Sequence, residues 1–301
     1  MRELLNIDPV VAEALETGQP VVALESTVIA HGLPRPINLE TARRLEQIVR
    51  ESGAVPATIA IIAGKLCVGV GDDQLRTLAE ESGVRKISTR DIPVAVAQHW
   101  TGATTVAATI WIAHRAGIKV FATGGIGGVH RGSLPDVSAD LPELARTPIV
   151  VVCSGAKIVL DLLATREWLE THAITVIGYE CDELPAFYSR TSALAVDARV
   201  DSAREVAEIF RAQQALQVSS ALLVTVPVPA AVELPSEQLR TVLTESLQAA
   251  EQSSISGREL TPFLLARMAQ QSGGATLRAN IALLENNARV AAEISTLLAH
   301  Q

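Results

Sequence analysis

The sequence has few cysteines and no long apolar run. Its three cysteines are an odd number spread far apart, which suits a reducing compartment and excludes a disulfide framework. The longest apolar stretch, residues 103–113, is well short of the roughly 18 residues that a membrane-spanning helix needs. The first residues carry acidic side chains and lack the basic-then-apolar pattern of an export signal. We therefore expect a cytoplasmic protein with no membrane partner.

Aromatic residues and positive charge are also scarce. The chain has nine Phe, Trp and Tyr residues and a net charge of -8, whereas a nucleic-acid groove needs a basic surface and aromatic stacking platforms. We therefore expect no nucleic-acid partner. Among the 25 cationic residues only four are lysines: Lys65, Lys86, Lys119 and Lys157. Because a lysine can act as an amine nucleophile or as a point charge for phosphate, each of the four is a candidate for chemistry.

Apolar β-branched segments alternate with amphipathic segments along the chain. The expected strands span residues 19–30, 58–63, 66–70, 84–87, 118–122, 149–153, 174–179 and 221–226. The expected helices span residues 38–51, 72–82, 104–116, 157–171 and 202–216, and three more helices finish the chain. This alternation predicts an α/β protein, a three-layer α/β/α sandwich with a mostly parallel central sheet. No linker-like segment divides the chain, and we expect residues 1–301 to form a single domain.

Ligands of such folds bind beyond the carboxyl ends of the strands. This rule directs attention to the segments that follow Val22, Phe121, Val152 and Val224. In the first of them Glu25 interrupts an apolar strand, and burial there would raise the pKa of its carboxyl group and suit it to donate a proton. A glutamate on an edge strand that faces water fits the same alternation, so the pattern leaves both interpretations open.

A glycine-rich segment, TGGIGGVHRG, occupies residues 123–132 after one of these strands. Glycines let backbone N–H groups approach an anion closely, and the adjacent His130 and Arg131 favour an anionic ligand. The dinucleotide-binding fingerprint is absent because no helix pattern follows the glycines. A glycine-rich turn without any ligand is the alternative.

Carboxylates follow in SLPDVSADLPEL, residues 133–144. Asp140 with Glu143 three residues later is typical of a helix cap, which is a purely structural role. Asp136 has no such explanation. The two aspartates together with Ser138 supply the hard oxygen ligands that Mg²⁺ or Mn²⁺ prefers.

Two of the four lysines stand at boundaries between elements. Lys157 is predicted to open a helix, where the positive end of the helix dipole would lower its pKa and leave a neutral amine able to form a Schiff base. An exposed helix lysine is the alternative. Lys86 and Arg90 flank a strand end and suit a phosphate, although a solvated basic edge fits them equally well.

Several motifs resemble one enzyme family. They are ALEST and HGLP in residues 23–34, GATTVAAT (102–109), FATGGIGGVHRG (121–132), DVSADL (136–141), VVCSGAK (151–157), GYECDELPAFYSRTS (178–192) and residues 261–288. Together they resemble the pseudouridine-5'-phosphate glycosidases, also called pseudouridylate synthases or indigoidine synthase A-like proteins. The resemblance covers nearly the whole chain.

The resemblance implies reversible cleavage of the C–C glycosidic bond of pseudouridine 5'-phosphate to uracil and ribose 5-phosphate, with a divalent metal, typically Mn²⁺, in a homotrimer. It implies Glu25 as proton donor, Lys157 as nucleophile and Asp136 as the metal-site residue. The implied substrate contacts are Lys86, Val106, Ser138, Ala139 and Asp140, and Thr123, His130 and Asn280 fall at further active-site positions.

Two rival functions remain open. A Schiff-base aldolase or lyase acting on another phosphosugar would keep Lys157 without selectivity for uracil. A non-catalytic homologue that only binds a ligand is the second rival, and the presence of both Glu25 and Lys157 argues against it. A sugar kinase is disfavoured because no ATP-phosphate loop is evident.

Overall fold

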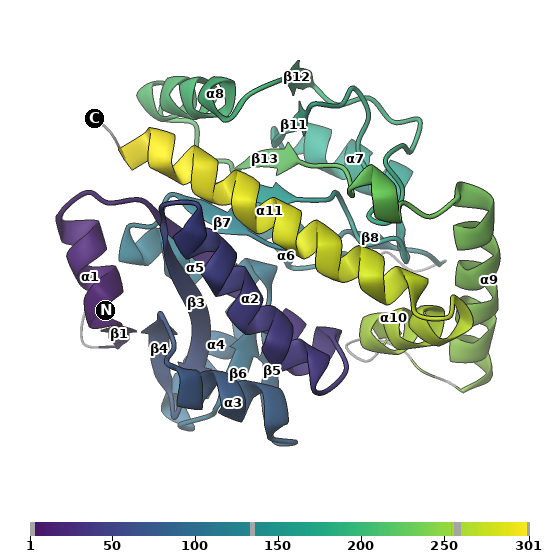
Figure 1. Cartoon of the computed structure of the whole chain (residues 1–301), viewed down its shortest axis with the longest axis horizontal. Coiled ribbons are helices and arrows are strands. Elements are labelled where there is room, and N and C mark those ends of the chain that lie inside the picture. The colour runs from purple at the N-terminus through teal and green to yellow at the C-terminus, as the bar shows by residue number, and fades with distance from the viewer. Residues whose placement is uncertain (1–3, 133–135, 254, 256–259, 300–301) are drawn as a thin grey trace.

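A mostly parallel sheet forms the centre of the molecule. Figure 1 shows the computed structural model, which describes residues 4–132, 136–253, 255 and 260–299. In these residues the main sheet has eleven strands. Nine of them follow the order β1 (Leu5–Ile7), β4 (Lys65–Val68), β3 (Val55–Ile62), β2 (Val21–Glu25), β7 (Val120–Ala122), β9 (Val150–Cys153), β13 (Leu222–Thr225), β11 (Thr175–Tyr179) and β12 (Ala198–Val200). From β3 to β12 all neighbours are parallel, whereas β3 pairs with β4 and β6 (Gly102–Thr104) in the antiparallel sense. Strand β5 (Arg85–Ile87) lies parallel to β6.

Helices cover both faces of this sheet. The long helix α11 (Ala275–Ala299) crosses β2, β7 and β9 and lies between α2 (Ile37–Glu51) and α8 (Ala203–Ala215), as Figure 1 shows. Helices α5 (Val106–Ala116) and α7 (Leu162–Thr171) pack against the sheet on the face behind it in Figure 1, and α6 (Asp140–Leu144) packs against α5. The remaining helices are α1 (Pro9–Glu16), α3 (Asp72–Glu80), α4 (Ile92–Ala97), α9 (Ser236–Gln252) and α10 (Leu260–Gln271). The predicted three-layer α/β/α sandwich is thereby confirmed.

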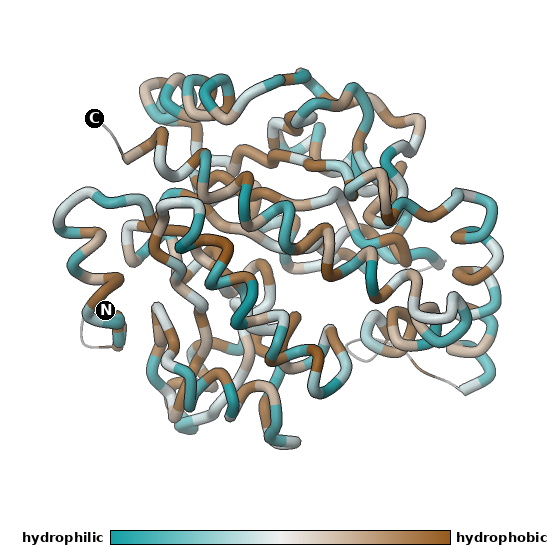
Figure 2. Tube along the Cα trace, in the orientation of Figure 1, coloured by the Kyte–Doolittle hydropathy of each residue, from teal (hydrophilic) through white to brown (hydrophobic). Residues whose placement is uncertain are grey.

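Covering both faces explains why the central strands are apolar along their whole length. Every residue of β2, β9 and β13 is buried, as expected for parallel strands packed on both sides. In Figure 2 the central strands are coloured mostly as hydrophobic, while the outer helices alternate between hydrophilic and hydrophobic positions. None of the helices in the described residues is long and apolar enough to cross a bilayer. That residues 1–301 form a single domain stays a prediction.

The predicted strand over residues 19–30 is wrong in its second half. Strand β2 ends at Glu25, and the chain then enters a short π-helix, Val28–Gly32. Ser26 makes this break, because its Oγ donates to the Ile59 carbonyl at 2.6 Å while its own carbonyl accepts from Ile29 at 3.0 Å. The hydroxyl thus anchors the end of the strand while the backbone turns away.

The predicted helix over residues 157–171 begins five residues later than expected. Lys157 lies in an irregular segment before the short strand β10 (Leu160–Asp161), which pairs with β8 (Val129–His130). Helix α7 begins at Leu162, where the Asp161 carboxylate caps it by accepting from the Ala164 N–H at 3.0 Å.

Candidate active site

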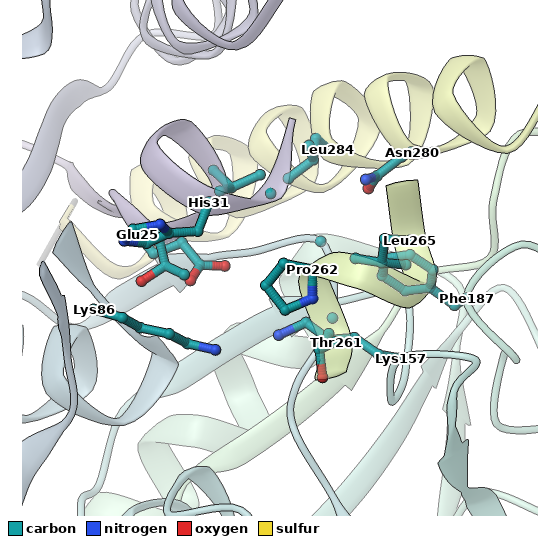
Figure 3. A pocket seen from close by; sticks show the side chains of 15 residues that line it. Glu25, His31, Lys86, Lys157, Phe187, Thr261, Pro262, Leu265, Asn280 and Leu284 are labelled. Carbon is teal, nitrogen blue, oxygen red and sulfur yellow. The ribbon is translucent and has the colours of Figure 1, made fainter. Parts of the chain in front are cut away.

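The carboxyl edge of the sheet holds a cavity in which the predicted acid and the predicted lysine meet. Glu25 ends β2, Lys157 follows β9, and Lys86 comes from β5; all three line the cavity. Figure 3 shows the two ammonium groups pointing toward the space beside the Glu25 carboxylate. The segment after Val224, which the rule of strand ends also pointed to, does not line this cavity. Val226 and its neighbours line a separate one.

This cavity has an apolar compartment and a polar compartment. Both are bordered by Glu25, Thr27, Lys86, Lys157 and Thr261. The apolar compartment is further lined by Val28, His31, Gly32, Gly124, Gly125, Phe187, Pro262, Leu265, Asn280 and Leu284. The polar compartment is further lined by Ser88, Arg90, Asp91, Thr105, Val106, Gly127, His130, Asp136, Val137, Ser138, Ala139, Asp140 and Leu160. The acid and the two lysines therefore lie where the apolar compartment meets the polar one.

Glu25 is a buried carboxyl group on a central strand. Its side chain is 7% exposed, and β2 is hydrogen-bonded on both sides, so the edge-strand interpretation is wrong. The Thr123 hydroxyl donates to Glu25 Oε1 at 2.5 Å. Burial raises the pKa of Glu25 and outweighs the opposing effects of Lys157 and Thr123. The carboxyl group is thus held in one orientation and biased toward its protonated form.

A buried asparagine that the sequence analysis missed supports this acid. Asn287 of α11 donates from Nδ2 to the Thr123 carbonyl at 2.8 Å and to the Ser154 hydroxyl at 3.2 Å. It is completely buried between the apolar residues Leu284 and Ala291 of the same helix. The sequence did carry one indication of this role, namely a polar residue within the apolar stripe of a helix. Buried polar groups nearly always form hydrogen bonds with specific partners.

Lys157 reaches the cavity without a helix terminus behind it. Its backbone N–H donates to the Ile126 carbonyl at 3.1 Å, which ties it to the glycine-rich segment. Because α7 begins only at Leu162, the predicted effect of a helix dipole on Lys157 is wrong. Lys157 interacts electrostatically with Glu25. Its ammonium group counteracts the rise in the pKa of Glu25 that burial causes.

Asp140 joins two parts of the cavity wall. Its Oδ1 accepts from the Ala107 N–H at 2.9 Å, at the first turn of α5, and its Oδ2 accepts from the Gly127 N–H at 2.8 Å. The predicted cap of its own short helix is wrong, since α6 has no side-chain cap. The side chain is 5% exposed, so these two bonds satisfy a carboxylate that is nearly removed from solvent.

The glycine-rich segment serves close packing more than anion binding. The N–H groups of Ile126, Gly127, Val129 and His130 donate to Gly155, Asp140, Thr165 and Asp136, respectively. The predicted anion cradle is therefore wrong at these four positions. A Cβ on Gly127 would lie 2.2 Å from Ser138 Oγ and 2.7 Å from Asp140 Oδ2, so glycine is required for the approach.

We expect Gly127→Ala to destabilise the protein by about 1–3 kcal/mol, because the added methyl group overpacks a fixed wall. Gly83→Ala is the matched control, since a Cβ there meets nothing within 4 Å. Urea denaturation of both variants measures the difference. Equal stability of the two variants would contradict the close approach at Gly127.

The other predicted site residues lie in the same cavity or directly behind it. Lys86, Val106, His130, Asp136, Ser138, Ala139 and Asp140 line the polar compartment, Asn280 lines the apolar one, and Thr123 lies behind Glu25. Arg90 borders the polar compartment together with Lys86. Lys119 lines a different cavity with Gly117 and Pro20, and takes no part in this site.

Asp136 is the residue that the sequence predicts at a metal site. It is exposed and borders the polar compartment with His130 and Ser138. Within the described ranges no group of three or more His, Cys, Asp or Glu side chains is arranged to enclose an ion. Mg²⁺ and similar ions keep several water ligands and need only one or two carboxylates, so this donor set fits such a site. Residues 133–135, which begin the predicted metal motif, lie outside the described residues.

Fold and site together define an α/β enzyme whose buried acid and lysine face a cavity of small-molecule type. The family profile described as "Indigoidine synthase A like protein" matches residues 10–297. The chain therefore belongs to the indigoidine synthase A-like family, the family of the pseudouridine-5'-phosphate glycosidases, and the predicted family is confirmed.

Individual relatives agree with this assignment. A pseudouridine-5'-phosphate glycosidase of Solibacter usitatus is 51% identical over 296 residues, which cover 98% of this chain and 99% of the relative. The enzyme of that name from Geobacillus kaustophilus is 49% identical over 297 residues, covering 98% and 99%. An indigoidine synthase A-like protein of Thermotoga maritima superposes with a TM-score of 0.90 at 39% identity, covering 99% of this chain and 97% of that one. A prealnumycin C-glycosynthase in complex with ribulose 5-phosphate superposes with a TM-score of 0.90 at 41% identity and the same coverage.

Proposed function

We propose that the chain cleaves the C1'–C5 bond of pseudouridine 5'-phosphate reversibly, giving uracil and ribose 5-phosphate. The observation that carries this proposal is the meeting of Glu25 and Lys157 between a polar and an apolar compartment. The names of the relatives support the substrate, and the ribulose 5-phosphate bound by the related C-glycosynthase supports a phosphosugar in this cavity.

The two compartments suit the two halves of this substrate. Lys86, Arg90 and His130 supply cationic and hydrogen-bonding groups for the sugar phosphate in the polar compartment. Phe187 and Leu284 offer apolar surface to the flat uracil ring in the other compartment. The bond to be broken then lies at their junction, beside the acid and the lysine.

The chemistry requires a proton on carbon. An ordinary glycosidase protonates an oxygen atom of its leaving group, whereas here the leaving atom is C5 of uracil. In the proposed sequence the C1'–O4' bond of the ribose breaks and its electron pair goes to O4'. The Lys157 amine bonds to C1' and gives up one proton, while O4' gains a proton and becomes a hydroxyl group. Glu25 then gives its proton to C5, the electron pair of the C1'–C5 bond returns to the uracil ring, and the nitrogen lone pair closes an imine at C1'. Water hydrolyses the imine, which releases ribose 5-phosphate and restores the amine.

Asp136 would hold a divalent metal, which we propose to be Mn²⁺, through water molecules. When bound, the ion supplies positive charge that organises ligand oxygen atoms. Val106, Ser138, Ala139 and Asp140 form the neighbouring wall against which the substrate would rest. A homotrimeric assembly and a cytoplasmic location, which the sequence analysis expects, are part of the same proposal.

The synthetic reaction tests this function directly. Ribose 5-phosphate and uracil are incubated with the protein and Mn²⁺, and the loss of free uracil is followed by chromatography. We expect uracil to be consumed, with at least a tenfold loss of rate after chelation and recovery when Mn²⁺ is restored. Unphosphorylated ribose is the control substrate and should react far more slowly.

The outcome also separates the rival functions. A Schiff-base lyase acting on another phosphosugar would bind ribose 5-phosphate and leave uracil untouched. A non-catalytic homologue would bind pseudouridine 5'-phosphate, as measured by calorimetry, and turn over none of it.

A further inference from the structure

Two buried polar atoms in the apolar compartment have no hydrogen-bond partner among the described residues. They are Oγ1 of Thr27 and Nε2 of His31. Both residues line the apolar compartment, and Figure 3 shows the imidazole beside Glu25. A buried polar atom without a partner costs about 1–3 kcal/mol, so two such atoms in one wall need an explanation.

The backbone holds both residues firmly in this position. They stand four residues apart, with Thr27 immediately before the π-helix Val28–Gly32 and His31 within it, so their side chains share a face. Asn38 of α2 fixes the π-helix by donating from Nδ2 to the Ile29 carbonyl at 2.9 Å. Ser26 anchors the preceding turn on β3. The unpartnered atoms therefore belong to a rigid wall.

The imidazole of His31 is uncharged at neutral pH. Burial lowers its pKa, and the nearby Lys86 lowers it further, against a weaker opposing hydrogen bond to the Arg85 backbone. A neutral imidazole offers one donor and one acceptor, and the Thr27 hydroxyl can do either. The wall thus presents hydrogen-bonding groups without adding charge, which is the chemistry that recognises a neutral heterocycle.

Uracil has alternating N–H and C=O groups along its edge and a flat apolar face. The wall between β2 and α2 offers the complementary pattern, with two uncharged polar atoms set among the side chains of Val28, Leu265 and Leu284. We propose that Thr27 and His31 bind the polar edge of the uracil base and thereby determine which base the enzyme accepts. This proposal rests on the proposed function, since it names residues that recognise one half of that substrate.

Variants that keep the shape of each side chain test the proposal. Thr27→Val removes the hydroxyl and retains the branched shape, and Thr27→Ser is the matched control that keeps the hydroxyl. His31→Phe keeps a planar ring without nitrogen, and His31→Gln keeps a polar atom at a similar reach. We expect the KM for uracil in the synthetic reaction to rise about tenfold or more in Thr27→Val and His31→Phe, and less in the two controls.

Binding of ribose 5-phosphate, measured by calorimetry on the same variants, separates base recognition from general damage. We expect its Kd to change less than twofold in the His31 variants, because His31 borders the apolar compartment and not the polar one. In Thr27→Val we expect the Kd to change less than the KM for uracil, because Thr27 borders both compartments. An unchanged KM for uracil, or an equal loss of ribose 5-phosphate binding, would overturn the role of these residues. A wild-type protein that binds ribose 5-phosphate and never consumes uracil would instead refute the proposed function itself.

Discussion

Replacing Lys157 by alanine is expected to lower the rate of uracil release by about 10⁴-fold or more, because the covalent route through C1' loses its amine. Lys157→Arg is the informative control. Arginine keeps the positive charge beside Glu25 but remains protonated and cannot form the imine. Both variants should therefore be inactive in a single-turnover assay with pseudouridine 5'-phosphate.

A different result is expected if Lys157 supplies only charge. Lys157→Arg would then keep a large part of the wild-type rate while Lys157→Ala lost it. Such a difference would contradict a covalent role, and an active Lys157→Ala enzyme would exclude any essential role. Thermal unfolding of both variants controls for misfolding.

The second large effect is expected at Glu25. Glu25→Gln keeps the shape of the side chain and removes the acidic proton, so cleavage should slow by about 10²–10⁴-fold. Cleavage needs the protonated acid, so its rate should fall as pH rises through the raised pKa of Glu25. Steady-state rates of uracil release across this interval measure the slope.

The raised pKa of Glu25 also predicts how the stability of the fold depends on pH. Below the pKa that Glu25 has in the unfolded chain, its carboxyl group is protonated in both the folded and the unfolded state. Its ionisation then has no effect on the free energy of unfolding. As pH rises through the folded-state pKa, the buried carboxyl group must ionise and stability is lost. Glu25→Gln avoids this cost and should be the more stable protein at neutral pH, although it cleaves the substrate far more slowly. An unchanged pH profile of activity together with equal stability would contradict a functional buried acid.

Much of the framework could be predicted because it depends on local patterns. The alternation of apolar strands with amphipathic segments indicated a covered parallel sheet, and the rule of strand ends pointed to Glu25 and Lys157. The scarcity of lysine singled out four candidates, of which Lys86 and Lys157 line the cavity and Lys119 lines a different one. These inferences need only the order of residues along the chain and the shared edge of parallel strands.

The parts that failed depend on contacts between distant segments. The strand expected through Ala30 breaks because Ser26 bonds to β3, a partner that hydropathy alone cannot identify. Asp140 seemed to cap its own helix, but its carboxylate bonds to Ala107 and Gly127, which are close only in the folded chain. Local propensity yields to such tertiary hydrogen bonds.

The apolar compartment was missed for a similar reason. Its walls come from β2, from the loop with Phe187, and from α10 and α11, so no single sequence window contains the pattern. Thr261 and Leu265 resemble ordinary positions of an amphipathic helix. Asn287 carried a usable indication, because it is a polar residue within an apolar helical stripe.

Chemical trapping of the covalent intermediate shows whether Lys157 bonds to the sugar. The wild-type enzyme is treated with ribose 5-phosphate and sodium borohydride, digested and examined by peptide mass spectrometry. We expect a reduced sugar adduct on Lys157 and none on Lys86, the other lysine of the cavity. An enzyme that stays unmodified while it turns over, or an adduct found on Lys86 alone, would contradict this expectation.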